Sequence, residues 1–231
     1  MNSPFIKESF VSIQGEGKYA GVRQLFIRFS DCDINCSGCD TDFSRGNEFE
    51  MLGAAFPNPA NLTEIVSHIE KTGVLNNVHS IAFTGGEPLL NHVFIKNFIS
   101  QLTSKTRFFL ETSGYHLDKL ADIYSLLDIV SMDIKISSSF GIVDNIANIK
   151  KGSFIENQKT YFKLIISKNF SENELDKVID LLVFKNFKEI FIHFKNNLFD
   201  SKCLNYIMDK FYNSGITSYY IPQIHKFLKV R

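Results

Sequence analysis

The chain has 231 residues, with 25 Lys and Arg against 25 Asp and Glu, so its formal net charge at pH 7 is zero. This balance excludes the basic surface of a nucleic-acid-binding protein, and no apolar run approaches the roughly 20 residues of a membrane span. Lys7 and Glu8 interrupt the N-terminal segment, which therefore lacks the apolar core of a secretion signal. We expect a cytoplasmic enzyme for a small molecule, without nucleic-acid or membrane partners, folded as a single domain over residues 1–231.

The chain begins with Pro4 to Val11, which we expect to be a short leading segment. Gln14-Gly15-Glu16-Gly17 follows, and its two glycines allow the backbone to turn closely around a ligand, although such a turn alone is a weak signal. The apolar run Leu25-Phe26-Ile27-Arg28-Phe29 then predicts a strand. A guanidinium buried in that strand needs a carboxylate partner, which either a ligand or an acidic residue of the chain would supply.

Three of the four cysteines, Cys32, Cys36 and Cys39, follow this strand in a C-x3-C-x2-C loop. A structural zinc site normally takes four protein ligands in two pairs, and no fourth Cys or His stands nearby in the sequence. In a 4Fe-4S cluster each thiolate holds one iron, so three cysteines leave one iron open to a non-protein ligand. The loop therefore predicts a catalytic cluster in a reducing compartment, with a non-catalytic zinc module as the alternative. We expect the remaining cysteine, Cys203, to be a buried apolar residue.

Strands and helices alternate through the rest of the chain. Residues 42–59, with Gly46, Gly53, Pro57 and Pro59, are expected to form an irregular loop, and Asn61-Leu62-Thr63-Glu64 is expected to cap the first helix. Further strands are expected at Ser80–Phe83, Phe108–Leu110, Ile129–Met132, Tyr161–Ile166, Ile190–Ile192 and Ser218–Ile221, with helices between them. This alternation predicts an α/β protein with a parallel sheet of about six strands, too few for a closed eight-stranded barrel.

Four motifs follow successive strands of this sheet. They are Cys32 to Thr41, Thr84-Gly85-Gly86-Glu87-Pro88, Glu111-Thr112-Ser113-Gly114 and Asp133-Ile134-Lys135. Because ligands collect at the carboxyl ends of parallel strands, we expect the four motifs to meet at one rim.

The C-x3-C-x2-C loop after a first strand resembles the radical S-adenosylmethionine (SAM) enzymes. Within that superfamily, Ser12 to Gly17, Phe26-Ile27-Arg28 and Cys39-Asp40-Thr41 resemble the 7-carboxy-7-deazaguanine synthase family of queuosine and 7-deazapurine biosynthesis. The resemblance implies an open, partial parallel β/α barrel that converts 6-carboxy-5,6,7,8-tetrahydropterin to 7-carboxy-7-deazaguanine with loss of ammonia. It also implies a 4Fe-4S cluster, SAM, Mg2+, an electron donor such as flavodoxin or ferredoxin, and a homodimer.

The resemblance also implies roles for individual residues. Cys32, Cys36 and Cys39 would hold the cluster, and Thr41 would hold Mg2+, with turn capping as its alternative role. SAM would be bound by Gly38, Asp40, Gly86, Glu111, Ser113, Lys135 and His193. In this set the Gly86 backbone would receive the SAM amino group, Glu111 the ribose hydroxyls, and Ser113 and Lys135 the SAM carboxylate. The substrate would be bound by Ile13, Gln14, Gly15, Arg28, Thr84, Gln223, His225 and Arg231.

The C-terminal segment is a further element of this implied site. Gln223 and His225 alternate with Ile224, which predicts an extended tail with its polar side chains on one side. The alternative is a tail that only packs against the last strand.

Two segments depart from the family pattern. Gly38 stands where the family usually has an aromatic residue, and His193-Phe194-Lys195-Asn196 stands where many relatives have Gln-Pro-x-Asp. Backbone contacts to SAM can survive the second change, whereas side-chain contacts need not. The nearest alternative function is another small radical SAM protein, such as a glycyl-radical activase, which would not need Gln14 to Gly17 or Thr41.

Overall fold

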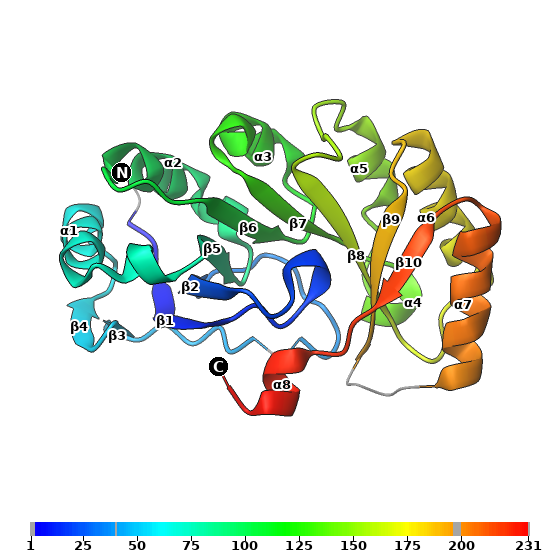
Figure 1. Ribbon diagram of the computed structural model, residues 1–231, viewed down its shortest axis with the longest axis horizontal. Helices are drawn as coiled ribbons and strands as arrows, with labels where there is room; N and C mark the ends of the chain where they lie inside the picture. The colour runs from blue at the N-terminus through cyan, green and yellow to red at the C-terminus, as the bar shows by residue number, and fades with distance from the viewer. Residues whose placement is uncertain (1–2, 40, 196–199, 231) are drawn as a thin grey trace.

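The structure is a computed structural model that describes residues 3–39, 41–195 and 200–230, without the side chains of residues 225 and 226. Over these residues the chain forms one sheet of ten strands in the order β10-β9-β8-β7-β6-β5-β2-β1-β3-β4 (Figure 1). Neighbouring strands from β2 to β10 run parallel, whereas β1 is antiparallel to β2. Because β10 and β4 lie at opposite ends of this order, the sheet is an open, partial barrel, which confirms the expected fold class.

The strand bounds confirm each strand that the sequence predicted. The strands are β1 Ile6–Ile13, β2 Arg23–Phe29, β3 Glu48–Met51, β4 Ala54–Pro57, β5 Ser80–Gly85, β6 Phe108–Thr112, β7 Ile129–Ile134, β8 Thr160–Ile166, β9 Glu189–Phe194 and β10 Thr217–Tyr220. The parallel part consists of β2 and of β5 to β10, so it has seven strands within the described residues where about six were expected.

Most of the helices cover one face of this sheet. The helices are α1 Leu62–Thr72, α2 His92–Gln101, α3 Leu117–Ile123, α4 Ser137–Phe140, α5 Ile146–Lys151, α6 Glu172–Phe184, α7 Ser201–Asn213 and α8 Ile224–Leu228, with 3-10 turns η1 Gly17–Tyr19, η2 Val74–Asn77, η3 Pro88–Asn91 and η4 Tyr124–Leu126. In Figure 1, α1, α2, α3, α5, α6 and α7 follow one another along the outer side of the sheet. Asn61 caps α1 as expected, because its side chain accepts from the backbone N–H groups of Thr63 and Glu64.

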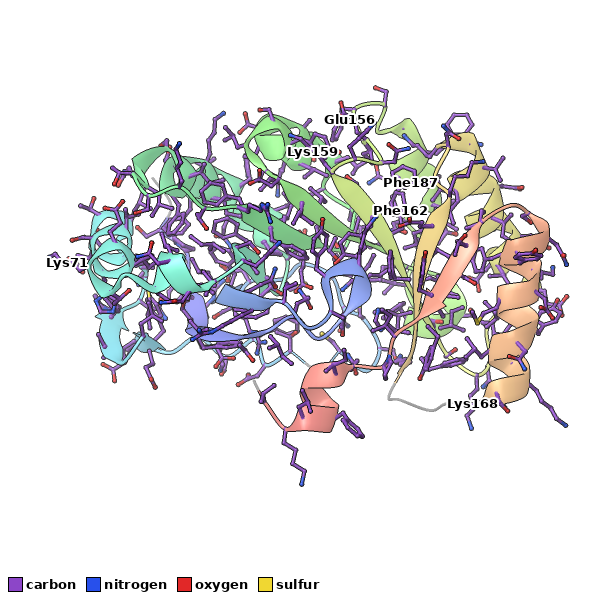
Figure 2. All side chains as sticks on the ribbon, in the orientation of Figure 1. Lys71, Glu156, Lys159, Phe162, Lys168 and Phe187 are labelled. Atoms are coloured by element: carbon purple, nitrogen blue, oxygen red, sulfur yellow. The ribbon has the colours of Figure 1, made fainter. Side chains whose placement is uncertain are left out.

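The larger hydrophobic core lies between the sheet and these outer helices. It contains fully buried residues of both layers, such as Ile27 and Phe83 from strands and Ile69 from α1. Phe162 on β8 and Phe187, which follows α6, belong to the same core, with ring centroids 4.6 Å apart (Figure 2). Among the described helices, none is long and apolar enough to cross a membrane.

The first part of the sheet differs from the sequence-based expectation. Pro4 to Val11 is not a leading segment but mostly strand β1, in which Ser9 pairs with Ile27 of β2. Residues 42–59 are not wholly irregular, because they contain the β3–β4 hairpin, whose Phe49 and Phe56 rings stack 5.8 Å apart. Each hairpin strand has only four residues, which is too short for a period-two pattern to stand out among the glycines and prolines.

The inner face of the barrel carries a second, smaller core. Residues two apart on a strand point to the same face. Inner-facing side chains of neighbouring strands therefore form layers across the sheet. One layer, here called the aromatic layer, consists of Phe26, Ala82, Phe109, Tyr161 and Phe191 from β2, β5, β6, β8 and β9. Tyr19 of η1 packs against this layer and closes it on one side. This aromatic layer forms a dry base within the barrel, below the carboxyl ends of the strands.

Candidate active site

A cavity of about 550 Å³ opens at the carboxyl ends of the parallel strands. The four motifs, which are far apart in the sequence, meet there as expected. All the proposed site residues that the structure describes line it: Ile13, Gln14, Gly15, Arg28, Cys32, Cys36, Gly38, Cys39, Thr41, Thr84, Gly86, Glu111, Ser113, Lys135, His193 and Gln223. Asp40, Arg231 and the side chain of His225 lie outside the described residues.

The floor of the cavity is a layer of polar side chains that lies directly above the aromatic layer on the inner face of the sheet. Each residue of the aromatic layer is followed two positions later by a side chain of the same face, and these residues line the cavity: Arg28, Thr84, Glu111, Lys163 and His193. Asp133, at the end of β7, lies in the same lining. On each of these five strands, the inner-facing side chain is therefore apolar at one position and polar or charged two residues later.

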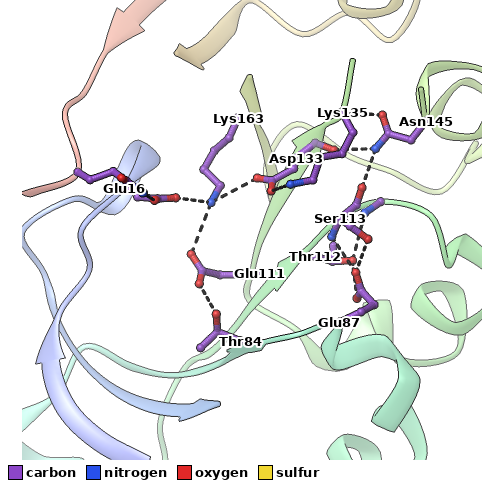
Figure 3. Close-up of polar contacts among 12 residues, drawn as sticks. Glu16, Thr84, Glu87, Glu111, Thr112, Ser113, Asp133, Lys135, Asn145 and Lys163 are labelled. Atoms are coloured by element: carbon purple, nitrogen blue, oxygen red, sulfur yellow. Dashed lines mark hydrogen bonds and ion pairs between the residues drawn. The ribbon is translucent and has the colours of Figure 1, made fainter. Parts of the chain in front are cut away.

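Lys163 is the centre of the charged network on this floor (Figure 3). Its Nζ lies 2.8 Å from Glu16 Oε2, 3.3 Å from Asp133 Oδ1 and 3.7 Å from Glu111 Oε1. Only 4% of its surface is exposed. A buried ammonium needs compensating charges, so Lys163 links the turn after β1 to the ends of β6 and β7.

The charges of this network stabilise one another. Burial disfavours the ammonium of Lys163, but Asp133, Glu16 and Glu111 outweigh it and raise its pKa well above the ordinary value. Burial also disfavours the carboxylate of Glu16, yet Lys163 and other neighbours hold its pKa far below the ordinary value. Burial lowers the pKa of His193, so this imidazole is neutral at pH 7. The floor therefore presents ionised carboxylates that accept hydrogen bonds.

Neutral side chains orient these carboxylates. Glu111 accepts from the Thr84 hydroxyl at 2.6 Å and from the Gln14 amide at 3.2 Å. The Gln223 amide donates to Glu16 Oε1 at 2.5 Å. Gln14, Thr84 and Gln223 were all expected to contact the substrate. The hydrogen bonds from Gln14 and Thr84 group Glu111 with the expected substrate residues, although the resemblance assigned Glu111 to the SAM ribose.

A second polar network lies behind the glycine-rich motif. Glu87 is fully buried and accepts from the Thr112 hydroxyl at 2.8 Å and from the Ser113 backbone N–H at 2.9 Å. The Ser113 hydroxyl also donates to Glu87. Asn145 donates to the Ser113 carbonyl at 2.6 Å and so holds the end of β6 from the other side. These bonds fix the loop that was expected to meet the SAM carboxylate (Figure 3).

The glycines of this motif have a packing role that the sequence did not reveal. A Cβ at Gly86 would lie 2.0 Å from the Asp31 carbonyl oxygen, and a Cβ at Gly85 would lie 2.3 Å from the Phe29 oxygen. The Glu87 N–H donates to Asp31 O at 2.8 Å. The glycines therefore let the motif pack directly against the segment that leads into Cys32.

Arg28 corrects one expectation. Its side chain is not buried but 36% exposed, and it forms an ion pair with Glu8 at 2.7 Å. The acidic partner in the structure is thus a residue of the chain, from the strand β1 that the sequence did not predict. The exposure follows from the position of Arg28 above the aromatic layer, where the barrel opens into the cavity.

The three cysteines fit the expected cluster. Cys32, Cys36 and Cys39 are free thiols that line the cavity, and burial raises the pKa of Cys32 and Cys36. Three sulfur donors on one loop would hold three irons of a 4Fe-4S cluster and leave the fourth iron open to a non-protein ligand. Cys203 lies on α7 and packs against the larger core as an apolar residue, although it is partly buried rather than buried.

The C-terminal segment also corrects an expectation. It is not an extended tail with alternating side chains, because Ile224–Leu228 forms the short helix α8. The Ile224 N–H donates to the Gly15 carbonyl at 3.0 Å, so α8 begins beside the turn of Gln14 to Gly17 (Figure 1). The tail therefore reaches the cavity, which both Gln223 and Val230 line.

Sequence reasoning missed two residues of the charge network in this cavity, Lys163 and Glu16. It did not assign Lys163, although a lysine two positions after Tyr161 in an apolar strand was the available signal. It mentioned Glu16 only as part of a glycine turn. The partners of Lys163 come from residues 16, 111 and 133, and no local pattern connects them.

Comparisons with known proteins agree with this site. A model of a 4Fe-4S single cluster domain matches residues 13–161. The 7-carboxy-7-deazaguanine synthase of Archaeoglobus fulgidus is 31% identical over 233 residues, which cover 97% of each chain. The chain belongs to the 7-carboxy-7-deazaguanine synthase family. Another member, from Methanothermobacter thermautotrophicus, is 41% identical over 140 residues, 61% of this chain and 52% of that protein, so the match spans about half its length.

The fold agrees with the same family. The crystal structure of QueE from Escherichia coli has a TM-score of 0.57 and 16% identity, and the match covers 94% of this chain and 93% of that chain. Membership of the 7-carboxy-7-deazaguanine synthase family confirms the resemblance that the three-cysteine loop and the Gln14 to Gly17 turn predicted. It disfavours both the zinc module and the glycyl-radical activase.

Proposed function

We propose that this protein is a radical SAM lyase that converts 6-carboxy-5,6,7,8-tetrahydropterin to 7-carboxy-7-deazaguanine with loss of ammonia. The observation that carries the proposal is that the three-cysteine loop and the carboxylate floor share one cavity. The ring N–H and amino groups of a pterin are hydrogen-bond donors, which match the carboxylate oxygens of Glu16 and Glu111. Its carboxylate matches the guanidinium of Arg28.

The residues of the chain bind and orient the two ligands in this proposal. When bound, the reduced cluster and SAM supply the radical chemistry that removes a hydrogen from the pterin. Glu111, held by Thr84 and Gln14, and Glu16, held by Gln223, position the donor edge of the pterin. The aromatic layer beneath them keeps water from the lower side of the ring.

The other side of the cavity suits SAM. The Gly86 N–H already donates to Phe29 O at 2.9 Å, so its carbonyl remains to accept from the SAM amino group. Lys135, which pairs with Asp133 at 2.8 Å, would meet the SAM carboxylate together with Ser113. Gly38, Asp40 and His193 complete the proposed SAM contacts. Ile13, Gly15, His225 and Arg231 complete the proposed substrate contacts.

Further parts of the proposal come from the family. Thr41 would offer one oxygen to Mg2+, which keeps several waters and accepts substrate oxygens. Reduced cysteines belong in a reducing compartment, so we place the enzyme in the cytoplasm, with flavodoxin or ferredoxin as its electron donor. We also propose a homodimer with one domain over residues 1–231. The zero net charge supports a small-molecule substrate rather than a nucleic acid.

The direct test is anaerobic reconstitution followed by incubation with SAM, a reductant and carboxytetrahydropterin, with and without Mg2+. Mass spectrometry should detect 7-carboxy-7-deazaguanine, and Mg2+ should increase its yield. Cys32→Ala, Cys36→Ala and Cys39→Ala should abolish SAM cleavage and lower the bound iron, whereas Cys203→Ala should retain both. SAM cleavage without deazaguanine would contradict the proposed substrate, and iron loss in Cys203→Ala would contradict the ligand set.

A further inference from the structure

Lys195, directly after β9, connects the cluster loop to helix α4. Its Nζ donates to the Ser37 carbonyl at 2.5 Å and to the Ser139 carbonyl of α4 at 2.7 Å. The Ser37 N–H in turn donates to the Phe140 carbonyl at 2.8 Å. The turn between Cys36 and Cys39 is therefore attached to α4 both directly and through the lysine.

The same lysine fits the backbone of Gly38. A Cβ at Gly38 would lie 2.9 Å from Lys195 Cε and 3.2 Å from its Nζ, closer than real Cβ atoms normally approach. Gly38 also has a φ of 68°, the left-handed region that favours glycine. The stem of Lys195 thus occupies the space that a side chain at position 38 would need.

The position of the ammonium gives it an electrostatic effect on the loop. Lys195 Nζ lies 5.4 Å from the Phe140 ring centroid, and Lys135 Nζ lies 4.2 Å from the same centroid. Cys36, Lys135, Phe140 and Lys195 all line the same cavity. Lys135 and Lys195 therefore lie on the same side of the cavity as Cys36. Lys195 also holds the backbone between Cys36 and Cys39.

We propose that Lys195 is a positioning residue for the cluster. Its two hydrogen bonds hold the Ser37-Gly38 turn so that Cys36 and Cys39 face the cavity, and its charge favours the reduced cluster, which carries one more electron. This role needs glycine at position 38. It concerns the cluster alone and does not depend on the pterin substrate, so its failure and that of the proposed function are distinguishable.

The first experiment removes the charge and retains the stem. Reconstituted Lys195→Met should lose iron to a chelator about tenfold faster than the unmodified protein, the effect of about 1.4 kcal/mol from charge-assisted hydrogen bonds. Its midpoint potential, measured by an EPR-monitored redox titration, should be more negative. Lys195→Arg retains the charge, so its rate of iron loss and its midpoint potential should differ less from those of the unmodified protein.

The matched control for this experiment is Lys210→Met. Lys210 lies on α7, where its ammonium pairs with Asp176 at 2.7 Å, so its loss should change neither iron retention nor potential. Unchanged iron retention and potential in Lys195→Met would overturn the proposal. A melting curve of each apoprotein, compared with that of the unmodified apoprotein, separates loss of the cluster from loss of the fold.

The second experiment tests the contact between Lys195 and Gly38. Gly38→Ala should accelerate iron loss more than Gly141→Ala, because Gly141 has the same φ of 68° but its Cβ would meet nothing closer than 3.7 Å. The effect of Gly38→Ala should shrink when Lys195 is also replaced by Ala, which removes the crowding stem. Equal effects of Gly38→Ala in both backgrounds would show that the two positions are independent and would overturn this part.

Discussion

Single residues on the cavity floor act through their charges. Lys163 lines the cavity but is only 4% exposed, and three carboxylates of the chain already surround its ammonium. We therefore expect its effect on a substrate to pass through Glu16 and Glu111. Removing the cation would leave the carboxylate of Glu16 buried without its largest compensating charge, which favours the protonated form of Glu16.

We predict that Lys163→Met raises the KM for the pterin by roughly tenfold or more, because charged hydrogen-bond acceptors contribute about 1.5–3 kcal/mol each. The KM for SAM should change much less. Steady-state kinetics with each substrate varied in turn measures this split, and Lys71→Met, an exposed change on α1, is the control (Figure 2). A variant with a lower kcat and an unchanged pterin KM would indicate a purely structural role for Lys163.

Among the elements, the turn after β5 positions the cluster loop. It packs so closely against the end of β2 that side chains at Gly85 and Gly86 have no space. Asp31, the residue in contact with Gly86, directly precedes Cys32. A change in this turn should therefore reach the first cluster ligand through the backbone.

We predict that Gly86→Ala destabilises the protein by about 1–3 kcal/mol, the usual cost of overpacking, and lowers the bound iron by more than half. Gly53→Ala is the matched control, because Gly53 has a φ of 80° in the β3–β4 hairpin and a Cβ there would meet nothing within 4 Å. It should lower stability without iron loss. Urea unfolding and iron analysis measure the two effects, and full iron occupancy in Gly86→Ala would contradict this account.

At the scale of the whole molecule, the open barrel leaves the sheet with two edges. The edge strands β10 and β4 have only four residues each, which limits pairing with other chains.

The charge network around Lys163 joins the turn after β1 to β6, β7 and β8, so its charges contribute to global stability. Glu16 binds a proton less readily in the folded state, and stability therefore falls as pH falls through its ordinary pKa of 4.5.

We predict that Glu16→Gln is less stable than the unmodified apoprotein at pH 7, and that the difference shrinks as pH falls below about 4.5. The carboxylate contributes stability that is present above its unfolded-state pKa and lost on the way to its lower folded-state pKa. The pKa of Lys163 is raised, so its own contribution is present throughout this range and is lost only at high pH. Urea unfolding from pH 3 to pH 7 measures the difference, and a constant difference would mean that Glu16 stabilises the fold without its charge.

The sequence by itself determined the features that depend on neighbouring residues. The spacing of Cys32, Cys36 and Cys39 indicated the cluster, and the alternation of apolar runs predicted the parallel sheet. Motifs placed after successive strands predicted their shared rim. These inferences succeed because the direction of a parallel strand decides which end carries its following loop.

Only the tertiary structure decided which distant side chains meet. The partners of Lys163, the ion pair of Arg28 with Glu8, and the contact of Lys195 with Gly38 join residues from different strands and loops. Their contacts depend on strand register and on the curvature of the whole sheet, which local periodicity does not specify. The hairpin of residues 48–57 and helix α8 were missed for a related reason. Both are short, and tertiary packing rather than intrinsic propensity stabilises them.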